Sequence, residues 1–179
     1  TLIYDTGPPM GQSDAGEFVI APYMRTIGRP HVDVLLVSHT DADHAGGVQS
    51  VLNNLSVEEI VGNPGPIARV ATPCLEKRPW VWDGVEFKTV AVRREQGEKL
   101  TDNNTSCMLL VDAAGQRLLL PGDIEDAGEA KIVQTVGPRL RADVVVAPHH
   151  GSSTSSTWAF VDAVQPRFVI YAAGLNNRY

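Results

Sequence analysis

The stretch that decides the fold reads Ser38-His39-Thr40-Asp41-Ala42-Asp43-His44-Ala45-Gly46-Gly47, directly after the apolar run Val34–Val37. Residues two apart on extended backbone point to the same side, so His39 and Asp41 are expected to share one metal ion. Asp43 and His44 follow where the chain turns into a helix, and we expect them to address a second ion close by. Glycines 46 and 47 allow a tight backbone turn behind this group.

Three further apolar runs end on a side chain of the kind that binds metals. Leu2-Ile3-Tyr4 leads to Asp5, Leu118-Leu119-Leu120 leads to Asp123, and Val144-Val145-Val146 leads to His149. Strand ends in a layered α/β protein can converge on one rim of the sheet, where active sites commonly lie. If these strands are neighbours, they bring carboxylates and imidazoles to a common rim.

The segment Pro148-His149-His150-Gly151-Ser152 delivers two imidazoles from one strand. Paired histidines suit one metal ligand and one acid, base or substrate contact. The hydroxyl-rich run 152–157 is expected to open a helix, whose N-terminus suits a phosphate group; the alternative is a plain helix cap at Ser155 or Ser156.

Two carboxylates have alternative readings. Asp123, after the Gly122 turn, is a good bridging ligand between two cations, and its alternative is a helix cap because an apolar helical pattern begins at Ile124. Asp5 is the weaker candidate, and we expect it to hold the His39 loop by hydrogen bonds.

Composition limits the class of protein. A chain of 179 residues with 43% hydrophobic and 20% charged residues fits one ordinary folded domain. No apolar run approaches the roughly 18 residues of a membrane-spanning helix. The net charge of −6 is no basic footprint for nucleic acid. Cys74 and Cys107 are either buried thiols or, in an oxidising compartment, one disulfide.

Strand-like and helix-like runs alternate, which predicts an α/β domain. Hairpins around Asp83-Gly84 and around Ala113-Ala114-Gly115 interrupt the alternation, so we expect a mixed sheet rather than a purely doubly wound one. Further strands are expected at 2–5, 33–38, 57–61, 143–147 and 167–171, helices at 17–27, 46–55, 124–136 and 155–164, and irregular loop at 63–79.

The pattern His39-x-Asp41-x-Asp43-His44 resembles the His-x-His-x-Asp-His signature of the metallo-β-lactamase superfamily, with Asp41 in place of the second histidine. Asp5, Asp123 and His149 are similar to that superfamily's first, fourth and fifth motifs. The resemblance implies an α/β (α+β) fold, a four-layer αββα sandwich with two metal ions at the sheet rim.

The order of motifs along nearly the whole chain resembles the ComEC family, the DNA-internalisation channel proteins of bacterial natural competence. The motifs are Asp14-Ala-Gly-Glu17, Pro22-Tyr-Met-Arg25, the 38–47 run, Trp80-Val-Trp-Asp-Gly84, Asn103-Asn-Thr-Ser-Cys107, Gly122-Asp-Ile-Glu125 and His149-His-Gly-Ser152. The resemblance implies a single metallo-β-lactamase-like domain over 1–179, trimmed from a larger membrane protein and lacking part of the N-terminal strand set.

The ligand set also follows from the resemblance. The first metal would be held by His39, Asp41 and Asp123, with Asn103 at best a weak ligand where the superfamily has its third-motif histidine. The second would be held by Asp43, His44, Asp123 and His149, with Asp5 behind the ligands. Replacing imidazole by carboxylate and amide hardens the site, which favours Mn²⁺, with Mg²⁺ or Zn²⁺ as alternatives.

The implied activity is a metal-dependent DNA nuclease, in which a hydroxide bridging the two metals attacks phosphorus and the non-imported strand is degraded. Asp43, Asp123 and His150 would be catalytic, and Ser152 would hold a phosphate oxygen. The implied partners are single-stranded DNA and the remainder of the channel and competence machinery. The domain would lie on the periplasmic or extracellular side of the inner membrane without inserting into it.

Two alternatives stay open. One is a phosphodiesterase or other hydrolase of small molecules on the same fold, kept open because the acidic charge counts against DNA binding. The other is a non-catalytic module that binds metal or DNA and gates the channel.

Overall fold

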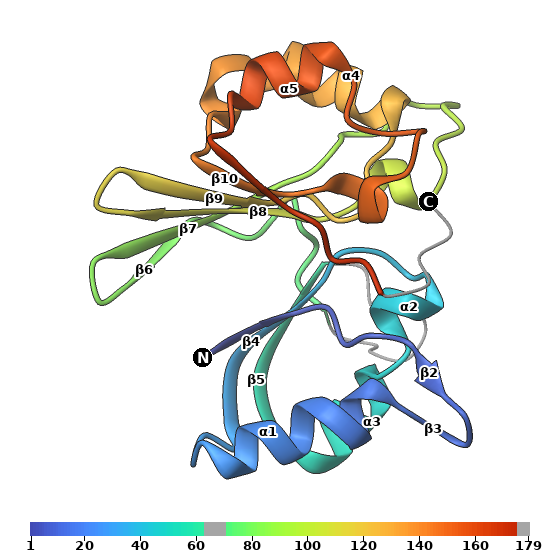
Figure 1. Ribbon diagram of the computed structural model, residues 1–179, viewed down its shortest axis with the longest axis vertical. Helices are drawn as coiled ribbons and strands as arrows, with labels where there is room; N and C mark the ends of the chain where they lie inside the picture. Colours follow the sequence, from blue (N-terminus) through green and yellow to red (C-terminus); the bar gives the residue numbers. More distant parts are fainter. Residues whose placement is uncertain (63–70, 175–179) are drawn as a thin grey trace. The chain divides into compact units, whose positions relative to one another are not determined.

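The computed structural model describes residues 1–62 and 71–174. Its contacts divide the chain into two compact units, Thr1–Glu76 and Lys77–Tyr179 (Figure 1). Each unit has its own sheet and its own apolar core, and each is described by itself below. The single domain expected over 1–179 stays a prediction.

The first unit is built on a parallel sheet in the order β1-β4-β5, with β1 at Leu2–Tyr4, β4 at His31–Val37 and β5 at Ser56–Gly62. The central strand β4 is buried almost continuously because both of its edges are paired and helices cover the sheet. A small hairpin joins β2 (Pro9–Met10) to β3 (Ser13–Asp14).

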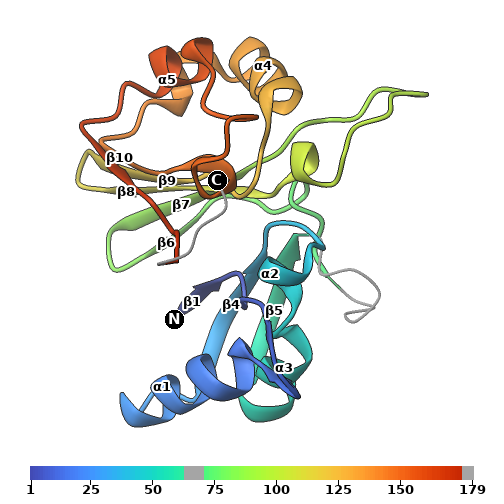
Figure 2. The same ribbon diagram turned by 45° about the vertical axis from the view of Figure 1, so that its right-hand side comes forward.

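Helices α1 (Ala21–Thr26) and α3 (Val48–Asn54) lie against the three-stranded sheet (Figure 2). The helix expected over 17–27 begins as a wide π-helical turn, η1, at Gly16–Ile20. The helix expected over 46–55 is preceded by a separate turn, α2, at Ala42–Ala45. Leu35, Val48 and Val51 are fully buried in this core.

Gly47 lies between α2 and α3, at a position with no room for a side chain. A Cβ at Gly47 would lie 2.5 Å from the Thr6 carbonyl oxygen and 2.6 Å from the Gly16 nitrogen. Gly46 and Gly47 have φ of −59° and −92°, which other residues also adopt. Glycine is therefore required at position 47 by the close approach of neighbouring backbone rather than by the tight turn expected from the sequence.

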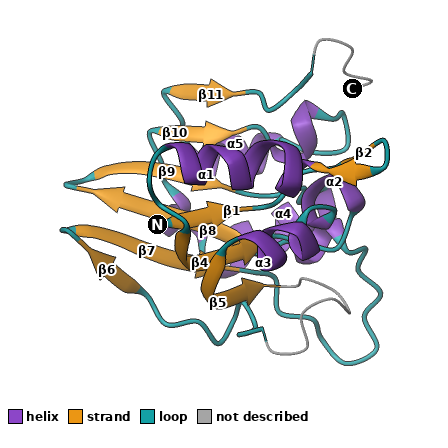
Figure 3. Ribbon diagram, turned by 90° about the horizontal axis from the view of Figure 1, so that it is seen from below, coloured by secondary structure: helices purple, strands orange, loops and turns teal. Residues whose placement is uncertain are grey.

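The second unit is built on a six-stranded mixed sheet in the order β11-β10-β9-β8-β7-β6. Strands β6 (Trp80–Trp82), β7 (Val85–Val90), β8 (Met108–Ala113) and β9 (Gln116–Leu120) are antiparallel. Strands β10 (Val144–Val146) and β11 (Phe168–Ile170) add to them in parallel (Figure 3). The sheet is thus interrupted by hairpins, as predicted.

Both predicted hairpins are present, and their turns explain the residues used. Asp83 and Gly84 have φ of 50° and 81°, and Ala114 and Gly115 have φ of 54° and 85°. Two positive φ values in succession match the twist of the flanking strands.

Helices α4 (Asp126–Thr135) and α5 (Trp158–Val164) lie on one face of the six-stranded sheet (Figure 1). Leu119, Val145, Ile132 and Phe160 meet in the core between them. Single turns of 3-10 helix complete the unit, η3 at Asn103–Thr105, η4 at Gly137–Leu140 and η5 at Pro148–Gly151.

The hydroxyl-rich run does lead into a helix, but the helix begins three residues later than expected, and neither Ser155 nor Ser156 is its cap. Helix α5 begins at Trp158, and Thr157 caps it by accepting a hydrogen bond from the Phe160 nitrogen. Ser156 has a left-handed φ of 61°, which does not fit a regular right-handed α-helix. The carboxylate of buried Glu129 accepts hydrogen bonds from the nitrogens of Ser156 (2.6 Å) and Thr157 (2.7 Å), and so holds the run as a loop.

Two further expectations concern Cys74 and Cys107 and membrane spans. Neither cysteine is a free thiol. Within the described ranges, no helix has the length and apolar character needed to cross a bilayer. Of the irregular loop expected over 63–79, residues 63–70 lie outside the described residues.

Candidate metal centre

Asp5, at the end of β1, organises the donors of the first unit. Its Oδ1 accepts a hydrogen bond from the Ser38 nitrogen (2.7 Å), and its Oδ2 accepts one from Ser38 Oγ (2.9 Å). The same Oδ2 lies 2.7 Å from Nδ1 of His44. Asp5 has a left-handed φ of 62°, a conformation that costs free energy in a non-glycine residue and is common at functional sites.

These contacts fix the tautomers of both histidines. Ser38 donates its only hydroxyl proton to Asp5, so its oxygen accepts from Nδ1 of His39 at 2.9 Å. A carboxylate only accepts, so His44 also carries its proton on Nδ1. Each neutral ring therefore presents its Nε2 lone pair, which is how metal-binding histidines are usually held.

Each Nε2 faces a carboxylate at a distance that suits a shared cation. His39 Nε2 lies 3.6 Å from Asp41 Oδ2, and His44 Nε2 lies 3.8 Å from Asp43 Oδ2. Both separations exceed a good hydrogen bond. Two donors at about 2.1 Å from one tetrahedral ion stand roughly 3.4 Å apart, and wider ligand angles lengthen this.

Asp123 follows β9 and the left-handed Gly122, whose φ is 62°. Its side chain is buried, and its nitrogen donates to Ser106 Oγ at 3.2 Å. The cap of α4 is Glu125, so the alternative of Asp123 as a helix cap is excluded. The side chain of Asp123 instead faces the histidines of η5.

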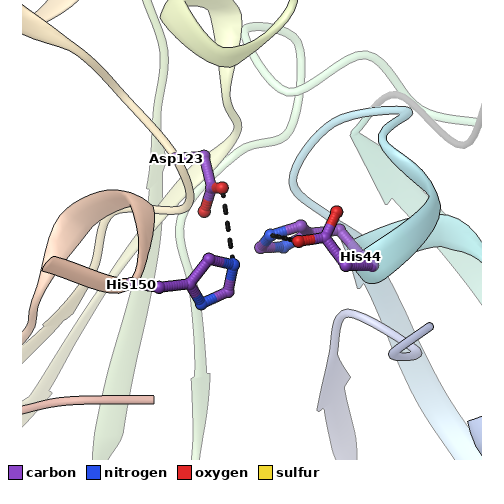
Figure 4. A group of neighbouring side chains, drawn as sticks. His44, Asp123 and His150 are labelled. Carbon is purple, nitrogen blue, oxygen red and sulfur yellow. Dashed lines mark ion pairs between the residues drawn. The ribbon is translucent and has the colours of Figure 1, made fainter. Parts of the chain in front are cut away.

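Both histidines of η5 face the same carboxylate oxygen. Asp123 Oδ2 lies 3.6 Å from Nε2 of His150 (Figure 4) and 3.9 Å from Nε2 of His149. Nδ1 of His149 lies 3.2 Å from Thr154 Oγ1, and Nδ1 of His150 lies 3.0 Å from the Ala172 carbonyl oxygen. The pattern of the first unit, Nδ1 on a fixed partner and Nε2 toward an aspartate, is repeated here.

The backbone at η5 is strained. His149 and His150 have φ of 48° and 55°, and such conformations cost of order 1–3 kcal/mol each. Hydrogen bonds from the His149 nitrogen to the Gly122 carbonyl (3.3 Å) and from the Ser152 nitrogen to the His149 carbonyl (2.8 Å) stabilise them. The strain turns two adjacent imidazoles toward one aspartate, which a regular strand or helix would not do.

Three residues that sequence analysis did not single out hold this region together. Asn104 Oδ1 accepts from the nitrogens of Glu125 (3.2 Å) and Gly128 (2.7 Å). Glu125 Oε1 accepts from Thr154 Oγ1 at 3.1 Å. The doublet Asn103-Asn104 and the motif ending at Glu125 were the available signals, but neither shows which side chain is buried.

The structure thus gathers the predicted site residues in two sets, one in each unit. The first unit brings together Asp5, His39, Asp41, Asp43 and His44, and the second brings together Asp123, His149 and His150. Ser152 is buried, with its Oγ 3.1 Å from Thr154 Oγ1, and Asn103 lies in η3. The ligand, catalytic and phosphate-binding roles of these residues stay predictions.

Residues 1–174 match the metallo-beta-lactamase superfamily. The chain belongs to this superfamily. The α/β class predicted from the sequence is therefore confirmed, and so is the resemblance to ComEC-family proteins, as the relatives below show.

The chain is similar in sequence to a competence protein and to a protein of the ComE operon. The chain is 36% identical over 178 residues to Competence protein ComA of Neisseria gonorrhoeae, covering 99% of this chain and 25% of that protein. It is 30% identical over 177 residues to ComE operon protein 3 of Bacillus subtilis, covering 92% of this chain and 23% of that protein. It thus spans about a quarter of the length of these relatives.

Solved structures show the same metallo-β-lactamase fold. A metallo-β-lactamase of Cronobacter sakazakii with a HARLDQ motif has a TM-score of 0.58 at 15% identity, over 80% of this chain and 65% of that chain. A variant of the CmlA β-hydroxylase has a TM-score of 0.52 at 17% identity, over 82% of this chain and 37% of that chain.

The metallo-β-lactamase fold implies divalent metal ions, and the residues of this chain fit them. Four imidazoles hold Nδ1 on an oxygen partner and turn Nε2 toward an aspartate at 3.6–3.9 Å. Imidazole and carboxylate are the ligands of zinc, manganese and related ions.

Proposed function

We propose that the chain is a metal-dependent nuclease that hydrolyses phosphodiester bonds of DNA during natural transformation and degrades the strand that is not imported. Superfamily membership and the competence-protein relatives support a metal-dependent hydrolase with a role in competence. The observation that carries the proposal is the shared geometry of the four histidines, each with Nε2 turned toward an aspartate.

The two sets of donors would bind two cations together. His39, Asp41 and Asp123 would hold one ion, with Asn103 as a weak fourth ligand. Asp43, His44, Asp123 and His149 would hold the other. Carboxylates outnumber imidazoles around the first ion, which favours Mn²⁺, with Zn²⁺ or Mg²⁺ as alternatives. When bound, such ions stabilise charge on phosphoryl oxygens and lower the pKa of a water molecule.

His150 is the residue placed to move a proton. Its Nδ1 is held by the Ala172 carbonyl oxygen at 3.0 Å, so protonation occurs at Nε2. The protonated ring would donate from Nε2 to the oxygen that leaves phosphorus. Ser152 would contact a phosphate oxygen, and Asp43 and Asp123 would be the other catalytic residues.

The negative charge of the chain limits its affinity for DNA. Two divalent cations would bring the formal charge of −6 to about −2, which removes repulsion without creating a basic groove. We therefore propose that the remainder of a ComEC-type channel supplies single-stranded DNA, and that this chain alone binds it weakly.

The absence of free thiols supports a place outside the cytoplasm. Neither Cys74 nor Cys107 is a free thiol, and oxidised cysteines persist in oxidising compartments. We propose the periplasmic or extracellular side of the inner membrane, with no insertion of this chain into the bilayer.

The acidic charge favours one second candidate, a phosphodiesterase of small molecules. Cleavage of a labelled single-stranded oligonucleotide separates the candidates, using metal-stripped chain resupplied with Mn²⁺, Mg²⁺ or Zn²⁺. The nuclease predicts metal-dependent cleavage that short oligonucleotides inhibit better than small phosphodiesters do, and that a His39→Ala/Asp43→Ala variant loses. Inhibition in the reverse order indicates the small-molecule enzyme, and metal binding without any cleavage indicates a non-catalytic module.

A further inference from the structure

The Thr154 hydroxyl has a contact for each of its hydrogen-bonding positions. Its Oγ1 lies 3.1 Å from Glu125 Oε1, 3.2 Å from His149 Nδ1 and 3.1 Å from Ser152 Oγ. A hydroxyl has one proton to donate and two lone pairs to accept with. The three contacts therefore occupy the one proton and both lone pairs of the Thr154 hydroxyl.

The carboxylate of Glu125 determines which group donates and which accepts in each of the three hydrogen bonds of the Thr154 hydroxyl. An ionised carboxylate has no proton, so Thr154 must donate its single proton to Glu125. Thr154 Oγ1 then accepts from both other neighbours, which places a proton on Nδ1 of His149 and directs the Ser152 hydroxyl toward Thr154. His149 is left with its Nε2 lone pair, on the side of Asp123.

Glu125 is itself fixed from the other side. Its Oε2 lies 3.3 Å from Thr101 Oγ1 and 3.3 Å from Nδ2 of buried Asn104. Its nitrogen donates to Asn104 Oδ1 at 3.2 Å. The carboxylate is thus held where the segment after β9 meets the η3 turn. Thr154 links it by hydrogen bonds to His149 in η5.

Oε1 of Glu125 also lies 3.5 Å from Nδ1 of His149, which is longer than a good hydrogen bond, so the shorter contacts between them run through Thr154. We propose that Glu125, acting through Thr154, is a positioning residue that sets the tautomer and the ring orientation of His149. The effect of Glu125 on the His149 ring depends only on hydrogen bonds within the second unit. The consequence for cation binding rests on the proposed function, because it requires His149 to be a ligand.

Thr154 offers a test that should not unfold the chain, because the residue is exposed. Thr154→Val removes the hydroxyl and keeps the shape, whereas Thr154→Ser keeps the hydroxyl. Thr135→Val is the matched control, since exposed Thr135 bonds only backbone oxygens of its own helix. Glu125→Gln replaces the acceptor by an amide that both donates and accepts.

The first readout is the imidazole ¹⁵N spectrum of the metal-free full chain above pH 8, with His149 assigned from a His149→Ala variant. Wild type, Thr154→Ser and Thr135→Val should show the proton of His149 on Nδ1. Thr154→Val and Glu125→Gln should show a mixture with the Nε2–H tautomer. The second readout is Mn²⁺ affinity by chelator competition, which Thr154→Val should lower about 10- to 100-fold.

An unchanged His149 tautomer in Thr154→Val or Glu125→Gln would overturn the proposal, as would a serine variant as impaired as the valine variant. A shifted tautomer in a chain that binds no Mn²⁺ even as wild type would support the positioning role and count against the proposed function. A shifted tautomer with wild-type Mn²⁺ affinity would overturn the link from Glu125 to the metal.

Discussion

Oδ2 of Asp5 lies 2.7 Å from Nδ1 of His44, although the two residues are 39 positions apart in the sequence. The same oxygen accepts the hydroxyl proton of Ser38, whose Oγ in turn contacts His39. One carboxylate therefore orients two imidazoles. It is the counterpart, in the first unit, of Glu125 acting through Thr154 in the second.

Asp5→Asn should weaken cation binding without preventing folding. The amide has the shape of the carboxylate, but only one of its two terminal atoms is an oxygen that accepts hydrogen bonds. It cannot replace both oxygens of Asp5, so the tautomers of His39 and His44 are no longer fixed. We expect Mn²⁺ affinity to fall about 10- to 100-fold, the usual effect of losing such a partner. Asp83→Asn, in the exposed β6–β7 turn with φ of 50°, is the matched control and should match wild type in chelator competition. Equal affinities of the two variants would contradict the role given to Asp5.

Gly47→Ala should destabilise the first unit. The added Cβ would lie 2.5 Å from the Thr6 carbonyl oxygen and 2.6 Å from the Gly16 nitrogen, and both are backbone atoms that cannot move aside cheaply. We expect a loss of about 1–3 kcal/mol in the free energy of unfolding, measured in urea. Gly174→Ala, where a Cβ meets nothing within 4 Å, should unfold as wild type does. A fully stable Gly47→Ala would show that this approach relaxes freely.

Glu129 should make stability depend on pH. Burial raises the pKa of its carboxyl above the ordinary 4.5, although hydrogen bonds from Thr157 and Ser156 oppose the shift. The folded chain then holds this proton more tightly than the unfolded chain, so its contribution is complete below pH 4.5 and is lost as the pH rises through the folded pKa. Compared with Glu129→Gln, wild type should lose stability over that window in denaturant unfolding between about pH 4 and pH 8. Parallel curves for the two proteins would refute this.

Leu119→Ala should destabilise the second unit, because Leu119 is fully buried between the six-stranded sheet and its helices. The loss of contacts and the cavity left behind are expected to cost about 2–5 kcal/mol of unfolding free energy. Val81→Ala is the control, since Val81 lies on the edge strand β6 with its side chain exposed. Thermal unfolding of both variants gives the comparison, and a loss below about 1 kcal/mol at Leu119 would mean that the core closes around the gap.

Local patterns were enough to predict most of the elements. The apolar runs at 33–38 and 143–147 became β4 and β10, and Asp83-Gly84 became a hairpin turn, because burial and turn chemistry act over a few residues. The clustering of His39, Asp41, Asp43 and His44 followed from their spacing at a strand end.

What the sequence did not reveal depends on long-range contacts. Helix α5 begins at Trp158 because Glu129, on another helix, binds the nitrogens before it. The left-handed backbone of Asp5, His149 and His150 is imposed by tertiary hydrogen bonds against local preference. The hydrogen bonds between Asn104 and Glu125 join segments about 20 residues apart, and no short sequence motif predicts them.

The central proposal is that the donors of this chain would bind two divalent cations. Its most direct test is Mn²⁺ titration of the metal-stripped chain, counting bound ions and recording their electron paramagnetic resonance, with Asp123→Asn beside wild type. The account predicts two ions per wild-type chain with the spectrum of a magnetically coupled pair, and loss of the coupled spectrum in Asp123→Asn. No Mn²⁺ bound by wild type, or the same coupled spectrum in the variant, would contradict it.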